Sequence, residues 1–160
     1  MTTYPIHPAE RLQARILSVL ETDLGGLTAF TGCSFVNERD ADETQMPMVV
    51  ARISESANQP PNSHVWHVAV TLQMMEDRKE SEQLISGNTR PRHEIRKENL
   101  SARLFGVWEG VSMADAVNVI SDGRGVYVLK THGQNYTPMS DIDMVVTEYS
   151  LTFVCVSTQQ

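Results

Sequence analysis

Residues able to bind a metal or attack a substrate are few in this chain and poorly spaced. The five histidines and two cysteines form neither a His-x-x-x-His nor a Cys-x-x-Cys pair, spacings that metal sites commonly use. Cys33 and Cys155 lie among apolar neighbours, where a free cysteine behaves as a small buried hydrophobe rather than as a thiolate. The sequence therefore predicts no catalytic residue, no metal site and no cofactor.

Carboxylates gather in one short stretch, residues 38–43, which we call the acidic segment. It holds four acids: Glu38, Asp40, Asp42 and Glu43. Grouped carboxylates can bind a divalent ion or transfer protons. No nucleophile or further ligand accompanies these four, so we interpret them as the solvated charge of a loop.

Basic side chains gather further along the chain. Between residues 90 and 103, five basic residues stand against two acidic ones, a local charge of +3. The aromatic residues of a single-strand nucleic-acid binder are missing. Two interpretations stay open: a charged loop leading into a helix, or a docking surface for an acidic protein partner. The docking hypothesis rests on what we call the basic segment, residues 90–97, through Arg90, Arg92, Arg96 and Lys97.

An amphipathic helix is the first element that could position these groups, over residues 8–24. Pro8 suits its first turn. Apolar residues recur there at every fourth position, which places them on one face: Leu12, Ile16, Leu20 and Leu24. Gly25 and Gly26 follow, and we expect them to end the helix in a left-handed conformation.

Three strands should come next, over residues 33–36, 48–53 and 66–74. The third is the clearest, because apolar and polar side chains alternate along it with a period of two. Its apolar members are Trp66, Val68, Val70, Leu72 and Met74.

Two helices and two strands complete the expected order. The helices should span residues 93–108 and 112–120, the second with Ser112 as its N-cap, and the strands residues 126–129 and 144–156. The order α-β-β-β-α-α-β-β predicts an α+β fold, a mostly antiparallel sheet flanked by helices. The expected core is Leu12, Ile16, Leu20, Trp66, Val68, Val70, Leu100, Leu104, Trp108, Leu151 and Phe153.

Length and composition limit the classes of protein. At 160 residues the chain is close to the commonest domain size, so we expect one domain with its core over about residues 8–156. No apolar run approaches the roughly 18 residues of a membrane span, and no signal peptide is evident. Thirteen basic and 20 acidic residues give a net charge of −7, which argues against broad nucleic-acid binding. Two cysteines favour a reduced, cytosolic setting.

The order of elements carries more information than any motif. An amphipathic helix leads into three strands, the last containing His64–Leu72; a helix containing Glu98–Trp108 follows, and the closing strands end with Glu148–Val154. This order resembles the tail terminator proteins of long-tailed bacteriophages, and the minor tail and tail-completion proteins similar to them. The resemblance covers roughly residues 8–156. It contains no catalytic signature, so no functional residue is carried over from it.

The resemblance implies a structural virion protein that is not an enzyme. Members of that family form a hexameric ring that caps the tail tube and faces the head connector. The implied partners are therefore further copies of this chain, the tail tube protein and the connector or stopper protein, with no membrane. DNA would pass through the ring without specific binding. The implied location is the tail or neck of the virion, after synthesis in the host cytoplasm.

Three alternatives remain beside the tail terminator. The chain could be another neck or tail-completion protein. It could be a small α+β ligand-binding or enzymatic domain with a pocket that uses Trp66, Trp108 and a carboxylate. It could also be a regulatory adaptor that docks acidic partners through the basic segment.

Long polar loops are expected at residues 37–47, 54–63, 76–92 and 132–143. Ordering such loops loses chain entropy, so we interpret them as segments that neighbouring subunits order. The stretch from Glu76 to Arg92 is highly charged, with only Leu84 and Ile85 to bury, and we expect it to be poorly ordered in the free subunit.

The sign of the charge predicts where the two charged segments lie in a ring. A basic lumen would hold DNA through its phosphates and impede its passage. We therefore expect the acidic segment to face the channel or its rim, and the basic segment to face a protein partner. The alternative is that both segments are merely solvated.

Overall fold

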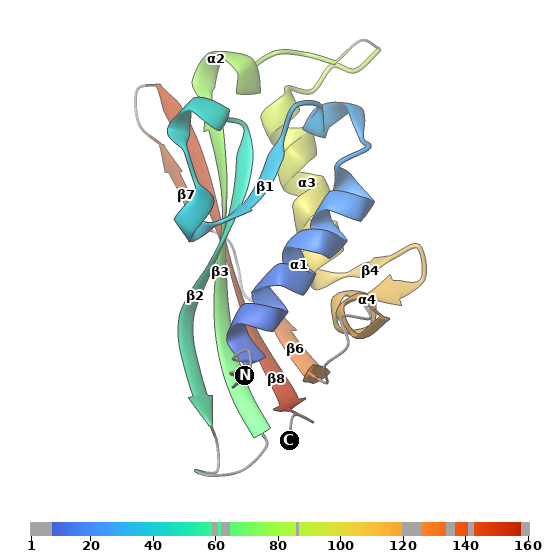
Figure 1. Cartoon of the computed structure of the whole chain (residues 1–160). Coiled ribbons are helices and arrows are strands. Elements are labelled where there is room, and N and C mark those ends of the chain that lie inside the picture. The colour runs from blue at the N-terminus through green and yellow to red at the C-terminus, as the bar shows by residue number, and fades with distance from the viewer. Residues whose placement is uncertain are drawn as a thin grey trace, which may run out of the picture.

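The computed structural model describes residues 8–58, 61, 65–85, 87–119, 126–133, 137–140 and 143–157. Its strands form a mixed, mostly antiparallel sheet. Helices α1 (Pro8–Leu24), α3 (Arg92–Phe105) and α4 (Met113–Val119) lie together on one side of that sheet (Figure 1). The α+β fold predicted from the sequence is thereby confirmed.

Six strands of the described chain form this sheet, in the order β1-β2-β3-β8-β6, with β7 also paired to β8. All pairs are antiparallel except β1 with β2, which are parallel. A parallel neighbour requires a crossover, and here residues 38–47 supply it through the short turns η2 (Glu38–Asp40) and η3 (Glu43–Gln45). The strands are β1 (Ser34–Asn37), β2 (Met48–Asn58), β3 (Val65–Asp77), β6 (Val126–Gly133), β7 (Thr137–Ser140) and β8 (Met144–Ser157).

The core lies between the sheet and the helices, where the sequence patterns place it. The apolar face of α1, from Leu12 to Leu24, is fully buried, and alternate residues of β3 and β8 meet it from the sheet. Nine of the eleven expected core residues are buried. Trp66 and Trp108 are only partly buried and pack against the edge of the core.

All four expected loops prove to contain regular structure: residues 38–40 and 43–45 form η2 and η3, residues 132–133 end β6, and residues 137–140 form the additional strand β7. Residues 54–58 continue β2, and residues 76–81 form the end of β3 and the helical turn α2 (Arg78–Ser81). The stretch from Glu76 to Arg92 was expected to be poorly ordered because its charges seemed to need water. That interpretation is wrong for Glu76, which is fully buried. Residues 59–60, 62–63, 86, 134–136 and 141–142 of the expected loops lie outside the described residues.

The helix expected over residues 93–108 ends earlier than predicted. It stops at Phe105, and the chain turns into a small hairpin of β4 (Val107–Trp108) and β5 (Val111–Ser112). Glu109 and Gly110 between them have positive φ angles of 49° and 84°, as a two-residue type I′ turn requires. Val107 is therefore not on a buried helix face but 67% exposed.

The end of α1 also differs from expectation. Gly25 does not have a positive φ; its amide donates to the carbonyl of Glu21 at 3.0 Å. A Cβ at this position would lie 2.4 Å from that carbonyl oxygen, so glycine is needed there for close approach rather than for a left-handed turn. At the start of α4, Ser112 accepts from the amide of Asp115 at 3.2 Å, which confirms the expected N-cap.

Candidate functional site

Arg96 of the basic segment does not face a partner. Its side chain is fully buried, where its Nε donates to the carbonyl oxygen of Ala29 at 2.6 Å. The interpretation of Arg96 as a docking residue is therefore wrong. Burial of a full charge requires partners, and these come from β3 and α2.

Four side chains form what we call the ion-pair cluster: Glu76, Glu80, His93 and Arg96. Arg96 Nη1 donates to Glu76 Oε1 at 2.9 Å and to Glu80 Oε2 at 2.8 Å, and its Nη2 also pairs with Glu80. His93 Nδ1 lies 2.7 Å from the other oxygen of Glu76. Burial opposes the charge of Arg96, but the hydrogen bonds and charges of Glu80 and Glu76 outweigh it and raise the pKa of Arg96.

Two patterns in the sequence could have revealed this cluster. The inward positions of β3 continue past Met74 to Glu76, since the burial of side chains alternates to the end of the strand. On α3, Arg96 and Arg103 share a face with Leu100 and Leu104, at the helical spacing of residues that point the same way. Arg96 was expected on a docking surface and Glu76 in a poorly ordered segment, although the periodicity of both positions is that of the core.

The other members of the basic segment lie nearer the surface. Arg90 is exposed and pairs with Glu94 at 3.4 Å and Glu98 at 2.5 Å; the hydrogen bonds that it donates to Glu98 and Glu94 raise its pKa. Arg92 and Lys97 are half-buried. The structure thus separates Arg96 from the other three residues of the basic segment.

The acidic segment forms the crossover between β1 and β2. Glu38 and Asp40 are exposed, and Glu38 pairs with Arg52 on β2 at 3.2 Å. Asp42 caps η3 by accepting from the amide of Thr44 at 3.0 Å, and the hydrogen bonds from Thr44 lower the pKa of Asp42. Glu43 lies in η3, with its side chain outside the described part.

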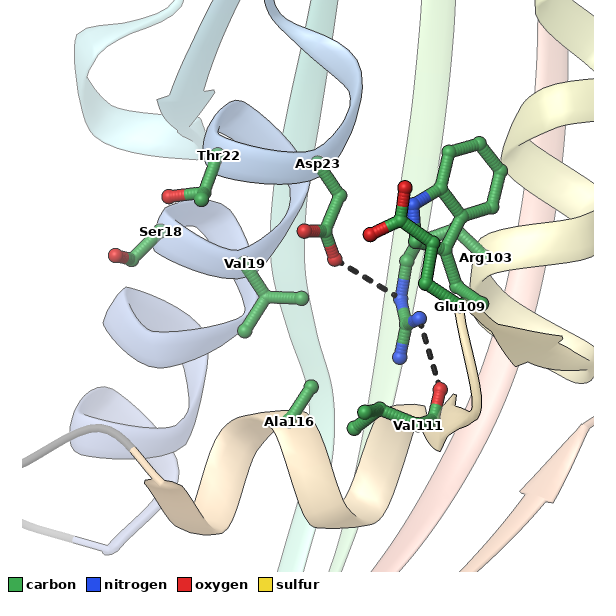
Figure 2. Close-up of a pocket in the computed structure, with 9 residues that line it drawn as sticks. Ser18, Val19, Thr22, Asp23, Arg103, Glu109, Val111 and Ala116 are labelled. Atoms are coloured by element: carbon green, nitrogen blue, oxygen red, sulfur yellow. Dashed lines mark hydrogen bonds and ion pairs between the residues drawn. The ribbon is translucent and has the colours of Figure 1, made fainter.

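A pocket of about 340 Å³ lies elsewhere, between α1, the end of α3, the β4–β5 hairpin and α4 (Figure 2). We call it the Arg103 pocket. Its apolar lining includes Val19, Trp108, Val111 and Ala116, and its charged lining consists of Asp23, Arg103 and Glu109. Of these residues, sequence analysis had singled out only Trp108 for a pocket. Trp66 is not part of this lining.

Arg103 is fully buried in this pocket but incompletely paired. Its Nη1 donates to the carbonyl of Val111 at 3.0 Å, and its Nε lies 3.5 Å from Asp23 Oδ2. Its Nη2 is buried without a hydrogen-bond acceptor, and its Nε has none within bonding geometry. Burial lowers the pKa of Arg103, and the charge of Asp23 offsets only part of that effect.

The two cysteines lie apart in the core and its margin. Cys155 is fully buried on β8 and Cys33 is partly buried before β1. Burial raises the pKa of Cys33 to about 12 and that of Cys155 to about 11, so both are neutral thiols near neutral pH, as predicted. Among the described residues, no group of three or more His, Cys, Asp and Glu side chains could hold a metal ion.

No family model matches the chain, and no curated protein matches its sequence. In the described part of the chain, none of the helices has both the length and the apolar character needed to cross a membrane.

Proposed function

We propose that this protein is a structural subunit of a bacteriophage tail: a tail terminator that forms a ring on the end of the tail tube. The observation that carries the proposal is the open outer edge of β2. β1 pairs with β2 only from Met48 to Ala51. From Arg52 to Asn58, that edge has no partner strand within the described part of the chain. Unpaired strand edges readily pair with another chain.

A ring needs two different surfaces on each copy, because a head-to-tail contact joins unlike patches. The sheet offers unlike ends, since β1 and the free edge of β2 lie at one end of the strand order and β6 lies at the other. The order of helices and strands on which the resemblance to tail terminators rests is also present: helix, three strands, helices and closing strands. Both features support the proposal.

In such a ring the acidic segment faces the channel or its rim. Exposed carboxylates at Glu38, Asp40 and Asp42 would repel the DNA backbone and let it slide. The tail tube protein and the head connector are the partners on the two faces, and the protein is part of the virion. Arg90, Arg92 and Lys97 stay as the proposed docking residues, now without Arg96.

Assembly and hydrogen exchange test this function together. We expect the purified chain to form closed rings with a central channel, in negative-stain images, either at high concentration or on isolated tail tubes. Amides of residues 52–58 should exchange more slowly in the ring than in the monomer. A chain that stays monomeric on tail tubes, or that forms only a two-fold dimer, contradicts the proposal. If rings assemble but the amides of residues 52–58 are not protected from exchange, the β2 edge is not the contact between copies.

A small ligand-binding domain is the second candidate, and the Arg103 pocket favours it. Trp108 lines this pocket together with two carboxylates, Asp23 and Glu109, although Trp66, which that alternative also uses, does not line it. Saturable ligand binding by a chain that forms no ring on tail tubes would make it the better interpretation.

A further inference from the structure

One hydrogen-bond donor beside the Arg103 pocket has no acceptor in the described part of the chain. Nη2 of Arg103 is a buried donor without an acceptor, and the same side chain lines the pocket. Figure 2 shows the guanidinium between Asp23 on α1 and Val111 of the hairpin. Buried donors in folded proteins almost always have a partner. An oxygen atom of a molecule in the pocket would supply it after a small shift of the guanidinium toward the pocket, because Arg103 has no accessible surface in this conformation.

The charge around Arg103 limits what kind of oxygen that is. One guanidinium faces the pocket together with two carboxylates, those of Asp23 and Glu109. The lining therefore has a formal charge of −1, and a further anion would be repelled in a partly desolvated site. An uncharged carbonyl oxygen can accept a hydrogen bond from Nη2 without that repulsion. A positive charge elsewhere on the bound molecule is also tolerated, because the lining is negative overall.

The remaining walls of the pocket are mostly apolar, apart from the hydroxyl-bearing Ser18 and Thr22 of α1. Val19 of α1, Val111 of β5 and Ala116 of α4 line it, with the half-buried Trp108. Small-molecule sites commonly combine such walls with a few convergent polar groups. A volume of about 340 Å³ suits a compact group.

We infer that the Arg103 pocket is a binding site for a compact apolar group that carries an uncharged carbonyl oxygen, such as an amide. The carbonyl accepts from Arg103 Nη2 and the apolar body lies against Trp108 and Val111. A free small molecule and an apolar residue of a neighbouring copy share this chemistry. The inference about the pocket does not depend on the proposed ring.

Three derivatives of leucine with the same apolar body test the chemistry. They are N-acetyl-leucinamide, which is neutral, leucinamide, which is a cation, and N-acetyl-leucine, which is an anion. We expect the neutral and cationic compounds to shift the NMR signals of Val111, Ala116 and the Trp108 indole in a saturable way. The anion should bind at least about tenfold more weakly. No saturable shift with any compound, or tightest binding of the anion, overturns the inference.

The hairpin offers a matched pair of variants. Trp108 pairs with Val111 across it, and Val107 pairs with Ser112, so Val111 and Val107 point to opposite faces. Val111→Asp should abolish binding of N-acetyl-leucinamide, whereas Val107→Asp should leave it unchanged. Equal loss in both variants contradicts the assignment. Glu109→Gln should reduce the discrimination between the neutral compound and the anion severalfold, and unchanged discrimination overturns the charge argument.

The effect of the bound compound on ring assembly shows whether the natural group is a free molecule or a residue of a neighbouring copy. If saturating N-acetyl-leucinamide also dissociates rings, the natural occupant is a residue of the neighbouring copy, an outcome that rests on the proposed function. If rings persist with the pocket filled, the occupant is a free molecule. A chain that binds the amide but never forms a ring supports the pocket and refutes the ring, so the two proposals fail separately.

Discussion

Arg96 and Arg103 lie on the same buried face of α3, and both are fully buried, but their surroundings differ. The guanidinium of Arg96 meets two carboxylates and a backbone carbonyl. That of Arg103 meets one backbone carbonyl and a carboxylate at 3.5 Å, and keeps an unpaired Nη2. Burial alone therefore does not show how well a charge is paired; the number of acceptors around it does.

The same comparison explains how each arginine affects folding. Removing one member of a well-paired buried cluster leaves the opposite charge without compensation, which is strongly destabilising. Removing an arginine whose partner carboxylate is partly solvated does not leave a fully buried charge without compensation, so the loss of stability is smaller. Asp23 retains 26% of its side-chain exposure, whereas Glu76 has none. We therefore expect the ion-pair cluster to stabilise the fold more than the pair of Arg103 and Asp23 does.

The largest expected effect comes from Arg96→Met. It should lower the free energy of unfolding by about 3–5 kcal/mol, because Glu76 stays buried without its cation. Urea denaturation followed by tryptophan fluorescence measures this change. Arg90→Met is the control, since Arg90 is exposed, and its urea midpoint should match that of the wild type. A wild-type midpoint for Arg96→Met would show that the cluster contributes no stability.

Leu104→Ala tests the apolar packing that both arginines share. Leu104 is 2% exposed on α3, and truncation of such a side chain costs about 2–5 kcal/mol. The melting temperature should fall accordingly. An unchanged melting temperature is incompatible with Leu104 in the core.

Alkaline pH should weaken the fold through Cys33. Burial raises the pKa of this thiol from 9.0 to about 12; the charge of Arg96 partly opposes the rise, and the charges of Glu76 and Glu80 add to it. Above pH 9.0 the unfolded chain loses this proton while the folded chain keeps it, so stability falls as pH rises. The loss attributable to this thiol is about 1 kcal/mol per pH unit. Cys33→Ala keeps Cys155, so the difference between the two stability curves isolates Cys33. Parallel curves would contradict the shift.

The smallest expected effect comes from Arg103→Met. The carboxylate left behind, Asp23, keeps 26% of its side-chain exposure, so no fully buried charge is left uncompensated and the free energy of unfolding should stay within about 1 kcal/mol of the wild type. Binding of N-acetyl-leucinamide should nevertheless be lost, because its acceptor no longer finds a donor. A loss of stability equal to that of Arg96→Met would mean that both arginines are structural.

Much of the fold could be predicted from the sequence because periodicity is local. The spacing of Leu12 to Leu24 determined the buried face of α1, and the alternation from Trp66 to Met74 determined the inward face of β3. The start of α1 at Pro8 and the cap at Ser112 were also evident from single residue types. Each of these features depends only on neighbours in the chain.

Tertiary structure alone decided the parallel pairing of β1 with β2 and both arginine environments. Arg96 meets Glu76, which is 20 residues away, and Ala29, which is 67 residues away. The Arg103 pocket joins α1 to a hairpin whose strands have two residues each, too few for any periodicity to appear. A charged residue in a sequence is by default solvated, since burial is unfavourable without partners. Whether partners exist is settled only when the sheet and helices bring distant segments together.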